Sequence, residues 1–234
     1  PAGLKASEVA ARRGHDVTLY EREGELGGQV NLAVKAPLRE ELGGVTRYLV
    51  KQIQNLGVEV KLGVEVTPQM VLAENPDVVV VATGSAPLKP DIPGINQENV
   101  VTARDVLRGV VKVGDRVLLF DDDGHWVAAG TAEFLADRGK KVEVVTPMLY
   151  VAKDLDSASL ILLYQRLYKK GVAMTPNTTL KAVSRSTVTV ANIYSGEERK
   201  IQGVDTVVIA AGGKADDKLY LALKGKVKEL YRVG

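Results

Sequence analysis

The first 22 residues constrain the fold more than any other segment, because a helical pattern leads directly into a strand pattern. Small side chains recur at every fourth position, at Gly3, Ser7 and Ala11, and so give one helix face that a strand can approach closely. Arg13-Gly14 ends the helical pattern, and the β-rich run of residues 17–20 follows it. A helix joined to a strand in this way is typical of α/β proteins with parallel sheets.

The same segment fits the second half of a dinucleotide-binding βαβ unit. In the fingerprint G-x-G-x-x-G the last glycine lets the helix pack close to the sheet, and Pro1-Ala2-Gly3 fits the final three positions. Glu21 then lies at the spacing where a carboxylate accepts hydrogen bonds from an adenosine ribose. An ordinary α/β crossover is the alternative interpretation. Because the chain starts within the motif and without an initiator methionine, we expect it to be a fragment of a longer protein.

Composition and charge narrow the classes of function. The chain is 45% hydrophobic, which supports a large core, while 31 basic and 29 acidic residues nearly cancel without a basic block. No apolar run, including residues 78–82, is long enough to span a bilayer, and no signal-peptide pattern opens the chain. The absence of cysteine rules out disulfides and cysteine-ligated iron–sulfur clusters within these residues. We therefore expect no nucleic-acid or membrane partner and a cytoplasmic setting.

Two glycine-containing turns are candidate ligand contacts. Residues 24–29 form a turn that can bring backbone N–H groups close to a ligand, with a plain surface loop as the alternative. The run 77–82 predicts a parallel strand buried on both faces, and Thr83-Gly84-Ser85 follows at its carboxyl end, where open α/β sheets bind ligands. Between them we expect a helix over 39–56, a strand over 58–67 and a short helix over 68–74.

A second copy of the opening unit follows a proline-rich linker at residues 85–94. Residues 11–17 align with residues 136–142 without a gap, and the same offset pairs Glu8 with Glu133 and Glu21 with Thr146. This repeat predicts a strand over 113–120, a helix over 127–138 and a strand over 141–145.

The turn of the second copy differs in its chemistry, because it contains Asp121, Asp122 and Asp123 but only one glycine. Carboxylates at a helix N-terminus compete for the N–H donors that bind phosphate, and they repel a pyrophosphate. We therefore expect a structural or docking role for this copy. A metal site at the three aspartates is the alternative, but their spacing is not that of a calcium loop, and we expect no metal.

The remaining patterns complete an α/β fold. We expect a helix over 155–170, a meander of strands over 172–174, 179–183 and 187–194, a buried strand over 206–213 and a final strand over 227–234. The predicted fold class is α/β with two Rossmann-like (FAD/NAD(P)-binding) domains. Each domain has three layers in the order ββα, and the second domain is inserted in the first. We place an ADP- or FAD-binding domain at residues 1–98 plus 206–234, and a degenerate NAD(P)-binding-like domain at residues 99–205.

Several motifs together resemble the flavoproteins that have two dinucleotide-binding domains. These are Pro-Ala-Gly-Leu at the start, Leu26-Gly27-Gly28-Gln29, Ala82-Thr83-Gly84-Ser85, Ile92-Pro93-Gly94 and the segment 230–234. Phe120 to His125 resembles the carboxy-terminal half of the trimethylamine and dimethylamine dehydrogenase branch. That branch belongs with 2,4-dienoyl-CoA reductase among the old-yellow-enzyme-related iron–sulfur flavoproteins. The resemblance implies that FMN, the four-iron cluster and the substrate site lie in an amino-terminal barrel outside these residues.

The resemblance also implies a ligand site in the first domain, which would hold the ADP part of FAD, or ADP alone. Its implied contacts are Gly3 at the pyrophosphate, Glu21 and Arg22 at the ribose, Gly28 and Gln29 along the site, Val66 at the adenine, and Thr83 with Gly84 over the pyrophosphate. The aspartate that usually follows the family's last turn is absent after Gly234, so we expect the isolated chain to bind FAD weakly or not at all. No catalytic residue is assigned, because hydride chemistry at a flavin is carried by the cofactor.

Three functions are compatible with these patterns. The first is the nucleotide-binding region of a flavin-dependent oxidoreductase of the amine-dehydrogenase type, inactive in isolation. The second is the NAD(P)H:FAD electron-transfer half of an enzyme like 2,4-dienoyl-CoA reductase, although the carboxylates of the second copy argue against NAD(P)H. The third is a non-catalytic docking scaffold. The partners implied are an adenine dinucleotide, the protein's own barrel, an electron carrier and a second copy of the chain.

Overall fold

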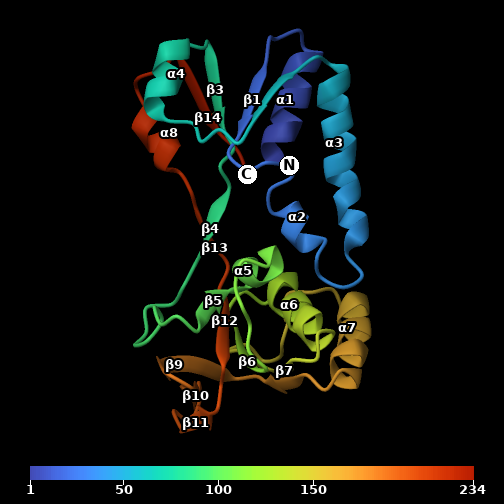
Figure 1. Cartoon of the computed structure of the whole chain (residues 1–234), viewed down its shortest axis with the longest axis vertical. Coiled ribbons are helices and arrows are strands. Elements are labelled where there is room, and N and C mark those ends of the chain that lie inside the picture. The colour runs from blue at the N-terminus through green and yellow to red at the C-terminus, as the bar shows by residue number, and fades with distance from the viewer. The chain divides into compact units, whose positions relative to one another are not determined.

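The computed structural model describes all residues from Pro1 to Gly234 and divides the chain into two compact units (Figure 1). Unit 1 comprises Pro1–Val34, Arg39–Ala86 and Lys214–Gly234, and unit 2 comprises Lys35–Leu38 and Pro87–Gly213. Both units mix helices with parallel strands, which confirms the α/β class. No helix has both the length and the apolar character needed to cross a membrane.

Unit 1 contains four parallel strands in two separate pairs. Strand β1 (Thr18–Glu21) pairs with β2 (Glu59–Leu62), and β3 (Val78–Val81) pairs with β14 (Glu229–Arg232). Its helices are α1 (Ala2–Arg12), α2 (Val30–Ala33), the 3₁₀ helix η1 (Glu40–Leu42), α3 (Gly43–Asn55), α4 (Pro68–Glu74) and α8 (Lys218–Leu223). Two short strands, β4 (Ser85–Pro87) and β13 (Gly213–Ala215), lie at the unit boundaries.

Helix α1 packs on α3 through a small apolar core of Leu4, Leu49 and Ile53. The missing side chain of Gly3 permits a close approach at the start of α1. A Cβ atom on Gly3 would lie 3.1 Å from the Cβ of Ala82 and 3.8 Å from Cδ1 of Leu19. The start of α1 therefore lies over the ends of both strand pairs, as the small-residue pattern predicted for a helix close to a sheet.

Unit 2 is built on one parallel sheet of five strands in the order β5-β12-β6-β7-β8. Their bounds are Val100–Thr102 for β5, Thr206–Ala210 for β12, Arg116–Asp121 for β6, Lys141–Val145 for β7 and Ala173–Thr175 for β8. The helices are α5 (Ala103–Arg108), α6 (Trp126–Ala136) and α7 (Ser157–Lys169). An antiparallel sheet of β9 (Thr178–Ser184), β10 (Thr187–Asn192) and β11 (Glu198–Gln202) completes the unit.

The side chains of β6 show how these layers are held together. Val117 and Leu119 belong to the core shared with α5, α6 and α7, whereas Leu118 and Phe120 belong to the core shared with β9 and β10. Because successive side chains of a strand point to opposite faces, the parallel sheet is covered by helices on one face and by the antiparallel sheet on the other.

The repeated glutamates occupy equivalent buried positions. Glu133 of α6 accepts hydrogen bonds from Arg166 Nε at 2.7 Å and Lys170 Nζ at 2.8 Å, which ties α6 to α7 and the residue after it. Glu8 of α1 is likewise buried and pairs with Lys5 at 2.6 Å and Arg12 at 2.9 Å. The hydrogen bond from Lys5 lowers the pKa of Glu8. The repeat therefore preserves a buried carboxylate with two cations in both units.

Several elements differ from the sequence-based expectation. Gly63 takes a φ of +70° and ends β2, so residues 63–67 do not continue the strand. Residues 173–175 form the edge strand β8 of the parallel sheet, and the third strand of the meander is β11 instead. Strand β3 is not buried on both faces, because Val78 and Val80 are 46% and 42% exposed. The short elements α5, α8, β4 and β13 were not predicted.

The boundaries of the units also differ from the expected domains at 1–98 plus 206–234 and 99–205. Strand β12 lies between β5 and β6 and hydrogen-bonds to both, so Thr206–Ala210 belongs to the sheet of unit 2. Unit 1 resumes only at Lys214, and unit 2 begins again at Pro87, within the proline-rich linker.

The buried ion cluster of unit 2 can be tested by substitution. We expect Glu133→Leu to lower the free energy of unfolding by about 2–4 kcal/mol, because it leaves the half-buried Arg166 without its carboxylate and Lys170 with Asp137 alone. Urea denaturation followed by circular dichroism measures the change. Glu98→Gln, which alters an exposed carboxylate of the same unit, is the matched control. A Glu133→Leu protein as stable as the control would contradict the assigned role.

Candidate nucleotide site

The candidate site lies at the carboxyl ends of the parallel strands of unit 1. The first residues of α1 reach this edge, since a Cβ on Gly3 would touch Ala82 and one on Gly234 would lie 3.1 Å from the Cβ of Ala2. Glu21 ends β1 at the same edge. A helix N-terminus and an acidic strand end therefore meet there.

Glu21 is held by a turn that follows β1. Its side-chain Oε1 accepts the N–H of Glu23 at 3.0 Å, and its backbone oxygen accepts the N–H of Val64 at 3.0 Å. The second bond connects β1 to the segment after β2, which contains the half-buried Val66. Arg22 is exposed and lies 3.7 Å from the carboxylate of Glu23. The structure therefore brings Glu21 close to the segment of Val66 and leaves Arg22 at the surface.

The glycine-rich turn meets the end of β3 through side-chain contacts. Gln29 donates a hydrogen bond from Nε2 to Ser85 Oγ at 3.1 Å, and a Cβ on Gly84 would lie 3.8 Å from the same nitrogen. Gly27 has a φ of +129° and is buried against Asn31. Gly28, with a φ of +55°, is exposed, and a Cβ there would face open space. Gln29 and Gly84 are thus brought together, with Gly28 at the open side.

Thr83 and Gly84 are fixed to the returning chain of unit 1. Thr83 donates its hydroxyl hydrogen to the backbone oxygen of Asp216, and the N–H of Asp216 donates to the backbone oxygen of Gly84 at 2.9 Å. Gly84 takes a φ of +70°, a left-handed conformation that favours glycine. These bonds hold the turn after β3 in one conformation at the edge of the sheet.

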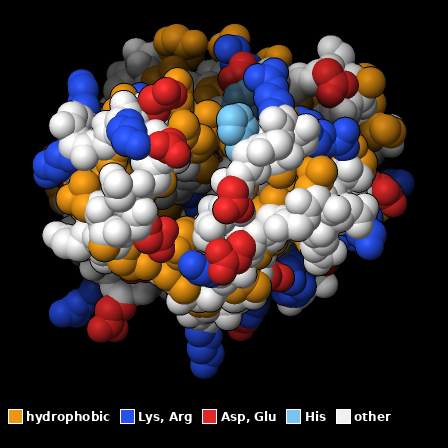
Figure 2. Space-filling view, turned by 90° about the horizontal axis from the view of Figure 1, so that it is seen from above, with side chains coloured by type: hydrophobic (Ala, Val, Ile, Leu, Met, Phe, Trp, Pro, Cys, Tyr) orange, Lys and Arg blue, Asp and Glu red, His pale blue; other side chains and the backbone are white.

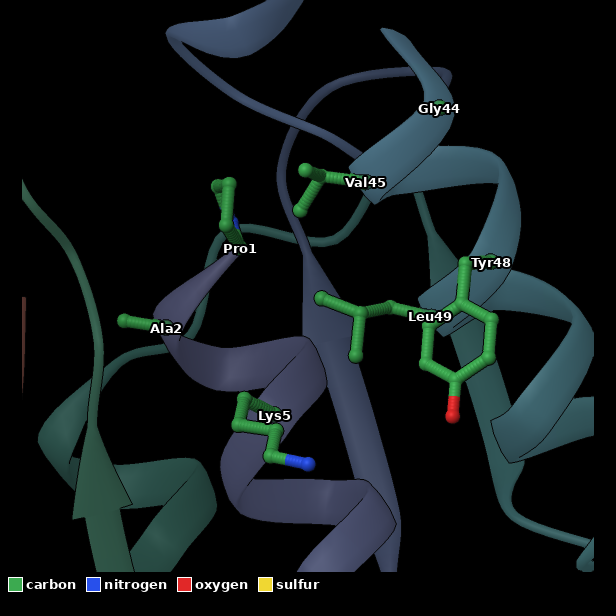
Figure 3. Close-up of a pocket in the computed structure, with 7 residues that line it drawn as sticks. All are labelled: Pro1, Ala2, Lys5, Gly44, Val45, Tyr48 and Leu49. Atoms are coloured by element: carbon green, nitrogen blue, oxygen red, sulfur yellow. The ribbon is translucent and has the colours of Figure 1, made fainter. Parts of the chain in front are cut away.

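An apolar hollow lies beside this edge and was not predicted. It has a volume of about 620 Å³ and is lined by Pro1, Ala2, Lys5, Gly44, Val45, Tyr48 and Leu49. Figure 3 shows Val45 and Leu49 of α3 pointing toward Pro1 and the start of α1. None of the residues proposed from the sequence as ligand contacts lines it. In the sequence, only Val45 indicates this hollow, because the helical pattern places it on the apolar face. In the structure its side chain remains 51% exposed.

The face of the molecule seen from above carries no block of one charge. In Figure 2 acidic and basic side chains are interspersed among apolar ones on this face. The formal net charge of the chain is +2, so the total charge does not favour a polyanion.

In unit 2, the turn between β6 and α6 is occupied by the side-chain carboxylate of Asp121. Asp121 is fully buried, and its Oδ1 accepts the N–H of Gly124 at 2.9 Å and of Asp123 at 3.2 Å. Its Oδ2 accepts the N–H of Ala152 at 3.4 Å. Burial raises the pKa of Asp121, while the hydrogen bonds from Gly124, Asp123 and Ala152 act in the opposite direction. The N–H groups of Asp123 and Gly124 are therefore already used within the chain.

Two more features of unit 2 bear on its chemistry. Thr146, the counterpart of Glu21, is fully buried, and its hydroxyl accepts the N–H of Met148 at 3.2 Å. No group of three or more histidine, cysteine or acidic side chains is arranged to hold a metal ion anywhere in the chain.

Parallel strands whose carboxyl edge collects a helix N-terminus, an acidic strand end and glycine turns define the class of dinucleotide-binding α/β proteins. A family model described as pyridine nucleotide-disulphide oxidoreductase matches residues 1–231. The chain belongs to this family of oxidoreductases.

Similar proteins refine this assignment. N,N-dimethylglycine/sarcosine dehydrogenase of Chromohalobacter salexigens is 36% identical, over 96% of this chain and 34% of its own length. Dimethylamine dehydrogenase of Hyphomicrobium sp. (strain x) is 26% identical, over 98% of this chain and 36% of its own length. The solved structure of 2-naphthoyl-CoA reductase with 2-naphthoyl-CoA matches with a TM-score of 0.92 and 34% identity, covering 99% of this chain and 34% of that chain.

These similarities confirm the predicted resemblance to the amine-dehydrogenase branch of flavin-dependent oxidoreductases. The chain spans about a third of the length of the relatives it matches. It therefore corresponds to one region of proteins that are much longer.

The buried carboxylate of unit 2 predicts a specific pH dependence. Because the folded chain raises the pKa of Asp121, the unfolded chain loses this proton first as the pH rises. The free energy of unfolding therefore falls as the pH rises from the ordinary aspartate pKa through the raised pKa, and Asp121→Asn should remove this part of the dependence. Urea denaturation at a series of pH values between about 3 and 7 measures it.

Asp115→Asn is the control for that experiment. Its hydrogen bond with Lys140 lowers the pKa of Asp115, so removing this carboxylate should change the slope in the opposite direction. The same slope change in both variants would contradict the assignment.

Proposed function

We propose that unit 1 binds the ADP portion of FAD, or ADP itself, within a flavin-dependent oxidoreductase of the amine-dehydrogenase type. The observation that carries this proposal is the convergence of Gly3, Glu21 and Gly84 at one edge of the parallel strands. A pyrophosphate fits a helix N-terminus because unpaired N–H groups and the helix dipole favour an anion there.

The eight residues predicted from the sequence have the following proposed roles. Gly3 would hold the pyrophosphate without a side chain in the way, and Glu21 would accept hydrogen bonds from the ribose hydroxyls. The others are Arg22 at the ribose, Gly28 and Gln29 along the site, Val66 at the adenine, and Thr83 and Gly84 over the pyrophosphate. The Gln29–Ser85 hydrogen bond and the bonds of Thr83 and Gly84 to Asp216 support a preformed site. When bound, FAD supplies the flavin ring that accepts electrons or hydride.

Unit 2 is proposed to be a dinucleotide-binding fold that no longer binds NAD(P)H. Asp121 accepts the N–H groups of Asp123 and Gly124 in the turn where a pyrophosphate would need donors, and it would repel that anion. Thr146 is buried and lacks the carboxylate of Glu21. Unit 2 would then serve as a structural or docking part, inserted into the chain of unit 1 as a second Rossmann-like domain.

The whole protein is proposed to contain an amino-terminal barrel that carries FMN, a four-iron cluster and the substrate site. The relatives named as dehydrogenases of N-methylated amines support an amine substrate. The partners proposed for the chain are this barrel, an electron carrier and a second copy of the protein.

A second candidate function is favoured by one comparison. The solved structure of 2-naphthoyl-CoA reductase matches 99% of this chain. This similarity to a reductase supports the alternative that the chain is the electron-transfer half of a reductase, which would take hydride from NAD(P)H. The occupied turn of Asp121 is the argument against it.

The ribose contact can be tested in the full-length protein. We expect Glu21→Ala to weaken adenine nucleotide binding about 10- to 100-fold, since charge-assisted hydrogen bonds contribute about 1.5–3 kcal/mol. Nucleotide released by heating is identified and quantified by chromatography. Glu25→Ala, at an exposed glutamate of the neighbouring turn, is the control. Unchanged nucleotide content in Glu21→Ala would favour the scaffold function.

The two oxidoreductase candidates differ in their reductant. We expect NADPH or NADH to leave the flavin of the full-length protein oxidised in a stopped-flow experiment, whereas a methylated amine reduces it. The reason is that the carboxylate of Asp121 already binds two N–H groups of the unit 2 turn and would repel a pyrophosphate. Rapid bleaching of the flavin by NADPH would instead establish the reductase function.

A further inference from the structure

The outer face of helix α7 carries no charge over about three turns. Its inner side is fixed to the core of unit 2 by Leu163 and Leu167, which are fully buried. Figure 1 shows α7 on the outside of this unit, beside α6. The exposed residues between the ends of the helix are Ala158, Ile161, Leu162, Gln165 and Tyr168. The outer face of a surface helix normally consists of polar and charged side chains, so this face has the composition of a covered surface.

The apolar side chains of this face are large and mostly accessible. Ile161, Leu162 and Tyr168 are 60%, 58% and 67% exposed. Ile161 and Tyr168 are seven residues apart, so they lie two turns apart on the same side of the helix. Single exposed apolar residues are normal, but a continuous apolar stripe is typical of a contact with another protein.

The aromatic ring of Tyr168 is already held in place. It packs edge-on against the ring of Tyr164, and the two ring centroids lie 6.1 Å apart. Tyr164 is in turn fixed by its hydroxyl, which donates a hydrogen bond of 2.8 Å to the backbone oxygen of Val151. A side chain that is ordered in this way loses little conformational entropy when a partner covers it, and tyrosine is enriched in protein interfaces.

This face is complementary to a second copy of itself when the two helices are antiparallel. Ala158 and Tyr168 are equally far from the middle of α7. A two-fold axis at the middle of the helix therefore places the large Tyr168 of one copy against the small Ala158 of the other, and Ile161 against Gln165. Large side chains that face small ones let two helices approach closely and interdigitate.

The charged residues at the two ends of α7 agree with the same arrangement. Asp156 caps the start of the helix, where its carboxylate accepts the N–H of Ser159 at 2.9 Å, and Lys169 ends it. Asp156 and Lys169 are both exposed. In an antiparallel pair Lys169 of each copy lies at the end where the other copy has Asp156, and the two helix dipoles run in opposite directions. A neutral centre with complementary charges at its rim is the usual composition of a protein interface.

We propose that the outer face of α7 is the interface of a homodimer, in which two copies pack α7 against α7 antiparallel about a two-fold axis. Each copy contributes the same residues, as in every two-fold interface. The neutral centre of the face offers no charge to a strongly acidic or basic partner. The proposal rests on the second copy named above as a partner, and it identifies the surface that binds this copy. It does not depend on nucleotide binding.

Substitution of Ile161 in the full-length protein tests the interface. Sedimentation velocity over a range of concentrations measures the dissociation constant of the dimer. We expect Ile161→Arg to raise this constant at least about 100-fold, because the two-fold axis buries two unpaired guanidinium groups in one contact. Val110→Arg, at a 68% exposed valine of unit 2 outside α7, is the matched control and should leave the constant unchanged. Circular dichroism checks that both variants fold.

A crosslinking experiment that does not use the arginine variants identifies what covers the face. Gln165 is replaced by the photo-crosslinking amino acid p-benzoylphenylalanine, and copies with light and heavy nitrogen isotopes are mixed before irradiation. We expect crosslinked peptides that join residues 157–169 of a light copy to residues 157–169 of a heavy copy. Crosslinks within one copy only would show that another part of the same polypeptide covers α7, and they would overturn the proposal.

Three other results would also contradict the proposed dimer. These are a full-length protein that is monomeric, a dimer that Ile161→Arg leaves intact, and the absence of any crosslink between copies. Nucleotide released by heating should be the same in all variants, because α7 is not part of the proposed ADP or FAD site. A failure of that site is therefore recognised separately from a failure of the interface.

Discussion

Hydrogen bonding between parallel strands is the constraint on which the structure depends. Parallel neighbours require a crossover, and here the crossovers are helices such as α6, which connects β6 to β7. All strands of such a sheet end at one edge, so the residues that follow them in sequence are gathered there. This is why Glu21 at the end of β1, Gly84 after β3 and the start of α1 lie at the same edge of unit 1, although they are separated in the chain.

Comparison of the two units separates what the fold needs from what a ligand needs. Both units retain the helix with its buried glutamate, Glu8 or Glu133, and its cationic partners. They differ at the turn, where unit 2 satisfies backbone N–H groups with the carboxylate of Asp121. A carboxylate from the chain is a permanent replacement for a bound anion, since it satisfies the same donors at no cost in binding entropy. The fold is therefore kept when the ligand chemistry is removed.

Local sequence patterns predicted the bounds of helices and strands correctly where the structure depends on interactions within one segment. Helix α4 forms at the predicted residues because Thr67 caps it and Pro68 begins it, and β7 has its predicted bounds because apolar side chains alternate there. The patterns failed where partners are distant. Residues 172–174 looked like part of a meander, but pairing with β7 places the strand in the parallel sheet. Likewise β12 was expected with the first domain, and its ladders with β5 and β6 place it in unit 2.

The sequence by itself determined the class of fold, the repeat, and the residue types of a dinucleotide site, because helix period, strand alternation and glycine spacing are local properties. Only the tertiary structure decided that Gln29 meets Ser85, that Thr83 and Gly84 are fixed to Asp216, and that Asp121 fills its own turn. It also decided that β1 pairs with β2 and β3 pairs with β14. The physical reason is that hydrogen bonds between distant segments depend on which strands become neighbours. The residues of one segment alone do not determine the strand order.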